Sequence, residues 1–227
     1  MRLSPPLRRL IAAGPSLPLA THGPRCAPTM ATAAAGDGHP DGPFTYPWPR
    51  PGLTVDIAVI SPGPRPALLL IQRGAAPAKG RWALPGGFVE PDEDLEAAAA
   101  RELAEETGLE VGAALRQVQS VGGPDRDPRG WTVTVAFAAV LPPPRSDEEA
   151  AQPPPVQGGD DAAAARWWPA ADLPALAFDH QRLIAAAFRS VASVEGGRQG
   201  GGEGGWGAGL VAAAEALEAR PWAPTRE

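Results

Sequence analysis

The sequence predicts a mixed α/β domain in which helices pack on a β-sheet. Short aliphatic and β-branched runs bounded by proline and glycine recur in the middle of the chain, a pattern typical of strands. A longer segment of the same region carries the start and stop signals of a helix, and a second helix is expected further along the chain. Because strands and helices follow one another within one stretch of the chain, we expect the helices to pack on the sheet.

Five segments are expected to form strands. Residues 52–60 (GLTVDIAVI) and residues 67–72 (ALLLIQ) are aliphatic runs joined by the proline-rich turn SPGPRP. Residues 131–141 (WTVTVAFAAVL) carry the strongest strand pattern of the chain. The remaining two candidates cover residues 116–121 and residues 166–168.

Two helices are expected beside these strands. The first spans residues 94–107, with Asp94 as its N-cap and Gly108 as its stop signal. The second covers residues 179–191. A short alanine-rich helix over residues 210–219 is an option near the C-terminus, and we assign no chemistry to it.

Composition and charge exclude several classes of protein. The chain has 227 residues, of which 44% are hydrophobic, so it can bury one ordinary core. No run approaches the roughly 18 apolar residues of a membrane span. The formal charge of -6 argues against a protein held mainly by nucleic-acid phosphates. We therefore expect a small-molecule partner, and neither nucleic acid nor a membrane.

The scarcity of cysteine and histidine limits the metal chemistry. Cys26, the single cysteine, lies near the N-terminus, so the rest of the chain has no thiol for a metal site or a nucleophile. With three histidines in all, a multi-histidine zinc site is implausible. Carboxylates are therefore the expected ligands of any metal ion.

The N-terminal segment differs in composition from the rest of the chain. Residues 1–44 contain four arginines before the first acidic residue, Asp37, which is typical of an organellar transit peptide. We favour the chloroplast slightly over the mitochondrion, because the segment is rich in proline and small residues. A start at Met30 predicts a shorter, cytosolic form. The alternative is a disordered extension rich in alanine and proline.

The predicted domain covers residues 45–192. Residues 142–160 form a proline-rich, acidic insertion that is expected to be a flexible loop, because it offers little to a core. Residues 193–227 are predicted to be a glycine-rich linker with a short tail.

Three glutamates lie within five positions of the first predicted helix: Glu102, Glu105 and Glu106. On a helical wheel they fall in or beside the apolar face, so a run of charge pointing at water fits poorly. That face consists of Leu95, Ala98, Ala99 and Leu103. Residues three and four apart on a helix have their Cβ atoms about 5 to 6 Å apart, so the carboxylates can aim at one point. The cluster predicts a site for Mg²⁺, which takes oxygen ligands, and two such ions about 4 Å apart would activate a water and neutralise a diphosphate.

Paired glycines precede this helix in the segment LPGGFVEPDED. Gly86 and Gly87 remove side chains where the backbone must approach a ligand, and a carbonyl there is a further candidate metal ligand. The alternative is an ordinary turn.

The residues from Gly87 to Leu109 match the Nudix box, G-x5-E-x7-R-E-U-x-E-E-x-G-U, in which U is a bulky aliphatic residue. Every constrained position is filled, which makes the match highly specific. The chain thus resembles the Nudix hydrolases. That resemblance implies an α/β/α sandwich with a mixed β-sheet, in which the box forms a loop-helix-loop that binds Mg²⁺ or Mn²⁺, and it implies hydrolysis of a nucleoside diphosphate linked to another group.

The resemblance also implies roles for individual residues. Glu102, Glu105 and Glu106 become catalytic metal ligands, and the carbonyl of Gly87 assists them. Glu93 and Arg101 pair to hold the helix against the loop, which is a structural role.

Segments outside the box resemble the ADP-ribose pyrophosphatase branch of the family over residues 46–191. They favour ADP-ribose, cleaved to AMP and ribose 5-phosphate. NADH, FAD, an oxidised nucleotide or a sugar nucleotide remain alternatives. A ligand-sensing regulator without catalysis is a second alternative, although the regulators of this family usually lose box carboxylates that are present here. The resemblance leaves a homodimer open as well.

Arginines outside the box are candidate substrate ligands. In the loop GGPDRDPRG, Arg126 and Arg129 are expected to grip phosphate, and Asp127 to accept from ribose hydroxyls. The alternative is a self-paired turn of Asp and Arg that stiffens the loop. Arg73 and Arg81 are further phosphate candidates, with a solvated surface as their alternative.

Aromatic residues and one histidine complete the candidates. Trp82, Trp131 and Trp48 offer flat rings for stacking on adenine, although a tryptophan is more often part of a core. His180 opens the second helix, where a backbone partner is the favoured interpretation over a general base. The base is instead assigned to Glu105 or to an acid of residues 146–149 (SDEE), with the choice left open.

Overall fold

The computed structural model describes residues 47–111, 115–123, 125–143, 153–159, 162–198 and 206–221. The expected transit peptide, residues 1–44, lies outside these ranges and stays a prediction. The described ranges all belong to one unit of the chain. No helix in them is both long enough and apolar enough to cross a membrane.

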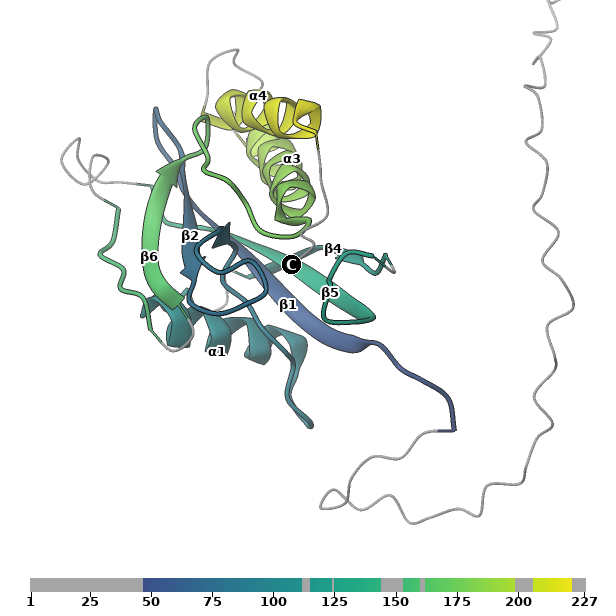
Figure 1. Ribbon diagram of the computed structural model, residues 1–227. Helices are drawn as coiled ribbons and strands as arrows, with labels where there is room; N and C mark the ends of the chain where they lie inside the picture. Colours follow the sequence, from purple (N-terminus) through teal and green to yellow (C-terminus); the bar gives the residue numbers. More distant parts are fainter. Residues whose placement is uncertain are drawn as a thin grey trace, which may run out of the picture. The chain divides into compact units, whose positions relative to one another are not determined.

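A six-stranded mixed sheet forms the centre of this unit (Figure 1). Its strands are β1 (Gly52–Ser61), β2 (Ala67–Arg73), β3 (Trp82–Ala83), β4 (Arg116–Val121), β5 (Thr132–Val140) and β6 (Ala162–Pro169). The order is β3-β2-β1-β5-β4, and β6 pairs with β2. β1 and β5 are parallel, with Gly52 opposite Thr132 and Ile60 opposite Val140, whereas the other pairs are antiparallel.

Helices cover both faces of the sheet (Figure 1). α1 (Leu95–Thr107) packs on one face, and α3 (His180–Arg198) and α4 (Trp206–Ala219) pack on the other. Alternate residues of β1 point to opposite faces, so Val59 joins the core beneath α1 while Ile60 joins the core beneath α3. Both residues are fully buried. The structure therefore confirms the α/β/α sandwich with a mixed sheet.

All five expected strands and both helices of the domain are present. α1 begins directly after Asp94, whose backbone is extended as an N-cap requires, although its side chain makes no capping hydrogen bond. Gly108 ends the helix with φ of 69° in the left-handed region, as the stop signal predicts. β6 is longer than expected, because it pairs with β2 along its length.

The predicted domain boundary at residue 192 is wrong, because it falls inside a helix. α3 continues to Arg198, through the start of the segment predicted to be a linker. α4 then packs on α3 and buries Leu210, Ala213, Ala214 and Leu217. Burial of this apolar face outweighs the cost of glycine in a helix, which is about 1 kcal/mol per residue relative to alanine.

Part of the proline-rich insertion packs against the domain. Within residues 153–159, the N–H of Gln157 donates to the carbonyl of Thr107 at 3.2 Å, and that of Gly159 donates to the carbonyl of Glu106, also at 3.2 Å. These bonds satisfy carbonyls that the end of α1 leaves without helical partners. This stretch is therefore hydrogen-bonded to the end of α1, and residues 144–152 lie outside the described residues.

Candidate active site

The three glutamates lie on α1 at different depths. Ala98, Ala99 and Leu103 are fully buried against the sheet, as the helical wheel predicts. Glu106 lies beside them and is 7% exposed, while the side chains of Glu102 and Glu105 are 14% and 47% exposed. The three carboxylates therefore range from buried, at Glu106, to about half exposed, at Glu105.

Arg101 joins the acidic groups of the box into one network. Its Nε and NH2 donate to the two carboxylate oxygens of Glu93 at 2.8 and 2.9 Å, so the expected pair is present. Its NH1 donates to Glu102 Oε1 at 2.9 Å and to Glu105 Oε2 at 3.0 Å. The carboxylates of Glu102 and Glu105 thus converge on a single cationic atom.

The paired glycines bring the backbone between β1 and α1. The Gly86 N–H donates to Glu106 Oε2 at 2.8 Å, and the Gly87 carbonyl accepts from the Val55 N–H at 2.9 Å. A Cβ at Gly86 would collide with the carbonyl of Val55, and one at Gly87 would lie 2.6 Å from Glu102 Cδ. A side chain at Gly86 has no room, and one at Gly87 would displace the Glu102 carboxylate, so the segment is a site of close approach and not an ordinary turn.

Burial changes the protonation of two of the carboxyl groups. It raises the pKa of Glu106 to about 8, against the opposing effect of the Gly86 hydrogen bond. It also raises the pKa of Glu102, which the Arg101 guanidinium partly counters. A nearby cation would reverse both effects, because it favours the charged carboxylate.

The chemistry of these donors fits a hard divalent cation. Carboxylate oxygens and a glycine carbonyl are the ligands that Mg²⁺ and Mn²⁺ accept. Arg101 NH1 already occupies the point shared by Glu102 and Glu105. Across the described ranges, no three acidic, cysteine or histidine side chains form a ready-made metal cluster. Cation binding at this point therefore requires Arg101 NH1 to withdraw.

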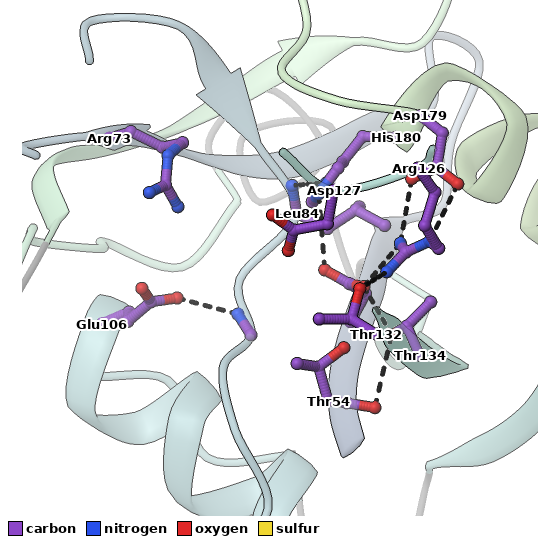
Figure 2. A network of polar contacts seen from close by, with 12 residues as sticks. Thr54, Arg73, Leu84, Glu106, Arg126, Asp127, Thr132, Thr134, Asp179 and His180 are labelled. Carbon is purple, nitrogen blue, oxygen red and sulfur yellow. Dashed lines mark hydrogen bonds and ion pairs between the residues drawn. The ribbon is translucent and has the colours of Figure 1, made fainter. Parts of the chain in front are cut away.

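A buried polar network lies on the other side of the glycine segment (Figure 2). Arg126 forms a two-pronged ion pair with Asp179, at 3.0 Å from Nε and 2.9 Å from NH2. Asp56 Oδ2 accepts the Thr134 hydroxyl at 2.6 Å, and Asp56 Oδ1 lies 3.6 Å from His180 Nε2. The side chains of Arg126, Asp56, Asp179 and His180 are at most 10% exposed. Asp56, Arg126 and His180 of this network line a hollow that adjoins the hollow lined by the three glutamates.

The predicted phosphate ligands occupy different surroundings. Arg73 and Arg129 line both the hollow that the three glutamates border and the adjoining hollow that Asp56 and His180 border, as expected of phosphate ligands. Arg129 donates to Asp127 Oδ2 at 2.8 Å from NH2, which is the self-paired arrangement left open above. Arg126 faces Asp179 within the protein, so its contact with substrate stays a prediction.

The hydrogen bonds of Arg129 affect the protonation of its partner. Burial acts to raise the pKa of Asp127, but the Arg129 hydrogen bonds prevail and lower it. Asp127 is therefore an ionised anchor that orients the Arg129 guanidinium over the rings of Phe88 and Phe178.

Four predicted ligands do not line either hollow. Trp82 packs against Trp168 with ring centroids 5.1 Å apart, the core role named as the alternative. Arg81 is exposed and lines neither hollow. Trp48 and Trp131 are 59% and 52% exposed, and they also lie outside both linings.

Residues 146–149, the alternative source of a general base, lie outside the described residues. Glu105 is the base candidate that the structure describes. His180 has the expected backbone partner, since its Nδ1 accepts the Leu84 N–H at 2.9 Å.

Several residues of the site were not predicted. Asp56 is a lone acid in the aliphatic run GLTVDIAVI, and an isolated charge in a buried strand was an available signal. Phe88 and Phe178 each receive the Arg129 guanidinium on their rings, at 5.2 and 5.7 Å from the centroid. Nothing local in the sequence indicates those contacts.

An α/β/α sandwich with an acidic helix face beside a glycine pair defines a Nudix-type domain. The model of the NUDIX domain family matches residues 50–187, which is more than half of the chain. The chain belongs to this family.

Relatives with known names match parts of the chain. It is 42% identical over 121 residues to an ADP-ribose pyrophosphatase of Methanocaldococcus jannaschii, covering 52% of this chain and 63% of that protein. It is 48% identical over 97 residues to the ADPR responsive transcriptional repressor NtrR of Acinetobacter baylyi, covering 41% of this chain and 38% of the repressor. The chain thus spans less than two thirds of the length of both relatives.

A solved structure supports the fold. The NUDIX domain of Shewanella oneidensis NrtR, solved in complex with ADP ribose, superposes with a TM-score of 0.54 at 35% identity. The match covers 63% of this chain and 90% of that domain.

Proposed function

We propose that the chain is a Nudix hydrolase that cleaves the diphosphate bond of a nucleoside diphosphate derivative with the help of a divalent metal ion. The observation that carries this proposal is the convergence of Glu102 and Glu105 on one cationic atom, 2.9 and 3.0 Å away. Glu106 and Gly87 line the same hollow as Glu102 and Glu105, so the candidate oxygen donors come from α1 and from the glycine segment before it.

The side chains of α1 would hold Mg²⁺ or Mn²⁺ together with the Gly87 carbonyl. Such an ion polarises a diphosphate and lowers the pKa of bound water. Arg101 NH1 would leave Glu102 and Glu105, while its Nε and NH2 stay on Glu93 and keep α1 in register with the loop. Glu105, the most exposed of the three, would accept the proton of the attacking water.

Two arginines would bind the diphosphate itself. Arg73 and Arg129 line both hollows, and a guanidinium matches the geometry of phosphate oxygens. Asp127 orients Arg129 through paired hydrogen bonds. The Arg129 side chain therefore loses less conformational entropy when substrate binds. Water adds across the diphosphate, and with ADP-ribose the products are AMP and ribose 5-phosphate.

ADP-ribose is the substrate we favour, for two reasons. The archaeal relative is named an ADP-ribose pyrophosphatase, and the Shewanella domain was solved with ADP ribose. A substrate panel tests the choice: kcat/KM is measured with Mg²⁺ and Mn²⁺ for ADP-ribose, NADH, FAD, nucleoside triphosphates and a sugar nucleotide. Another substrate preferred by tenfold, about 1.4 kcal/mol in transition-state binding, contradicts the choice of ADP-ribose. A chelator that leaves turnover intact contradicts the metal dependence.

A sensor of ADP-ribose is the second candidate, because the Acinetobacter relative is a repressor that responds to ADPR. All box carboxylates are present in this chain, which favours the enzyme. The variant Glu105→Gln separates the two candidates. If it loses turnover and the cellular phenotype together, the enzyme is supported; if it loses turnover but keeps the phenotype and ADP-ribose binding, the sensor is supported. Direct DNA binding by the wild type also supports the sensor.

We also propose a subcellular location and an oligomeric state. We propose an organellar location, with the chloroplast favoured, from the arginine-rich, acid-poor segment before Asp37. Fusing residues 1–44 to a fluorescent protein tests this directly. A homodimer is tested by light scattering of the purified chain.

A further inference from the structure

His180 and Glu106 reach the same short segment, residues 84–87, from opposite faces of the sheet (Figure 2). Glu106 comes from α1, and His180 is the first residue of α3. Since α1 and α3 pack on opposite faces of the sheet, the glycine segment lies between helices of two different layers. His180, which contacts the segment from the α3 side, has no role in the proposed function.

The hydrogen bond from Leu84 determines which His180 nitrogen carries the proton. Nδ1 accepts the Leu84 N–H at 2.9 Å, so this nitrogen has no proton of its own. Burial lowers the pKa of His180, which leaves a neutral imidazole with its proton on Nε2. That nitrogen faces Asp56 Oδ1 at 3.6 Å.

Asp56 is itself held by neighbours from other elements. Its Oδ2 accepts the Thr134 hydroxyl of β5 at 2.6 Å and lies 3.9 Å from Arg126 NH2. Arg126 in turn pairs with Asp179, the residue directly before His180. At the start of α3, Asp179 is bound to Arg126, which also donates to Thr132 of β5, and the next residue, His180, faces Asp56 of β1. The Asp179 ion pair restricts movement of this end of the helix.

The position of Leu84 affects the positions of Gly86 and Gly87, because only Pro85 separates them and the backbone of this segment is hydrogen-bonded to its neighbours. The N–H of Ile57 donates to the carbonyl of Pro85 at 2.9 Å, and Gly86 and Gly87 are bound to Glu106 and Val55. A Cβ added to Gly87 would lie 2.6 Å from Glu102 Cδ, so the Gly87 backbone and the Glu102 carboxylate are close neighbours. At such close range, a small shift of the backbone changes how the Gly87 carbonyl and Glu102 face one another.

We propose that His180 is a positioning residue of the cation site: it anchors the Leu84 N–H, and through it holds the Gly87 carbonyl beside Glu102, while Asp56 orients the imidazole. This inference rests on the proposed function, because it takes the Glu102 and Gly87 oxygens as cation ligands. His180 acts through the backbone and contacts no substrate.

Binding of Mn²⁺ tests the inference without turnover. Free Mn²⁺ is measured by electron paramagnetic resonance in titrations of the full chain, with circular dichroism to confirm folding. His180→Asn keeps an acceptor near the position of Nδ1, whereas His180→Gln moves its polar atoms outward to the position of Nε2. We expect His180→Gln to weaken Mn²⁺ binding by about tenfold, the range found for residues that orient metal ligands. We expect His180→Asn to stay within about threefold of the wild type.

A matched control and a double variant sharpen this test. Arg189→Ala removes an exposed ion pair between α3 and Glu218 of α4 that lines neither hollow, and should leave Mn²⁺ binding unchanged. Asp56→Asn should weaken binding in the wild type and have no further effect in His180→Gln, because Asp56 acts through the imidazole. Effects that add would overturn the role given to Asp56.

Equal Mn²⁺ affinities of folded His180→Asn and His180→Gln overturn the inference. A wild type that binds no Mn²⁺ overturns it as well, since there is then no site to position. A wild type that binds Mn²⁺ but hydrolyses no nucleoside diphosphate derivative contradicts the proposed function alone. The variant affinities still decide the role of His180 in that case.

Discussion

Glu106 accepts the Gly86 N–H at 2.8 Å, and this bond joins the last turn of α1 to the glycine pair. Glu106 belongs to the helix of the Nudix box, and Gly86 directly precedes the box and lies against Val55 of β1. The carboxylate is buried, so its charge is unfavourable until a cation or further donors approach it. The bond thus links the geometry of the loop to the ionisation of a candidate metal ligand.

Replacing Glu106 by Gln should reduce catalysis more than stability. The amide oxygen can still accept the Gly86 N–H, but it cannot supply the charge that a divalent cation requires. We expect kcat/KM for ADP-ribose to fall by at least about 100-fold, at the upper end of what loss of metal-site groups costs. Steady-state kinetics with saturating Mg²⁺ measures this, and a thermal melt checks folding. Activity near that of the wild type would remove Glu106 from the ligand set.

The stability of the metal-free protein should fall as pH rises. The folded pKa of Glu106 is raised to about 8 from an ordinary value of 4.5, so the folded state holds its proton more tightly than the unfolded state. The contribution is fully present below pH 4.5 and is lost as pH rises to about 8. Thermal melts in chelator from pH 5 to 8 should show a larger decrease for the wild type than for Glu106→Gln. Parallel curves would contradict the shift.

Substitution of Gly86 or Gly87 should be more damaging than substitution of Gly123. At Gly86, φ is 152° and an added Cβ meets the Val55 carbonyl, so Gly86→Ala should destabilise the fold by about 2 kcal/mol or more. Gly87→Ala should displace the Glu102 carboxylate and chiefly lower activity. Gly123→Ala is the control, because nothing lies within 4 Å of its added Cβ. Chemical denaturation and kcat are the two measurements.

Arg101→Lys should weaken the box although it keeps the positive charge. A lysine cannot donate to Glu93 in a fork and to Glu102 and Glu105 at the same time. We expect a loss of about 1 kcal/mol in unfolding free energy, comparable to one or two hydrogen bonds, together with reduced kcat. Denaturant titration measures the first quantity. Unchanged stability would show that the forked ion pair is not needed to hold α1 against the loop.

Leu210→Ala tests whether α4 belongs to the domain. Leu210 is fully buried, so removal of its side chain should cost about 2 to 5 kcal/mol. Glu215→Ala, at an exposed position of the same helix, should have little effect. An unfolding free energy insensitive to Leu210→Ala would indicate that α4 does not pack as described.

The positions of α1 and of every strand except β3 were predictable from the sequence, because each depends on local periodicity and on nearby stop signals. Leu103 and Glu106 occupy the faces that the helical spacing assigns them. The end of α3 was not predictable in the same way. Glycines 196 and 197 favour a linker by propensity, and packing against α4 decides otherwise.

The sequence by itself determined the acidic and glycine residues of the site, since their identity and spacing lie within one motif. Only the tertiary structure decided that Asp56, Arg126 and His180 gather beneath the glycine segment, and that Trp82 packs against Trp168. These contacts join residues that are far apart along the chain. They depend on strand order and on the packing of α3, which spacing within one segment does not encode.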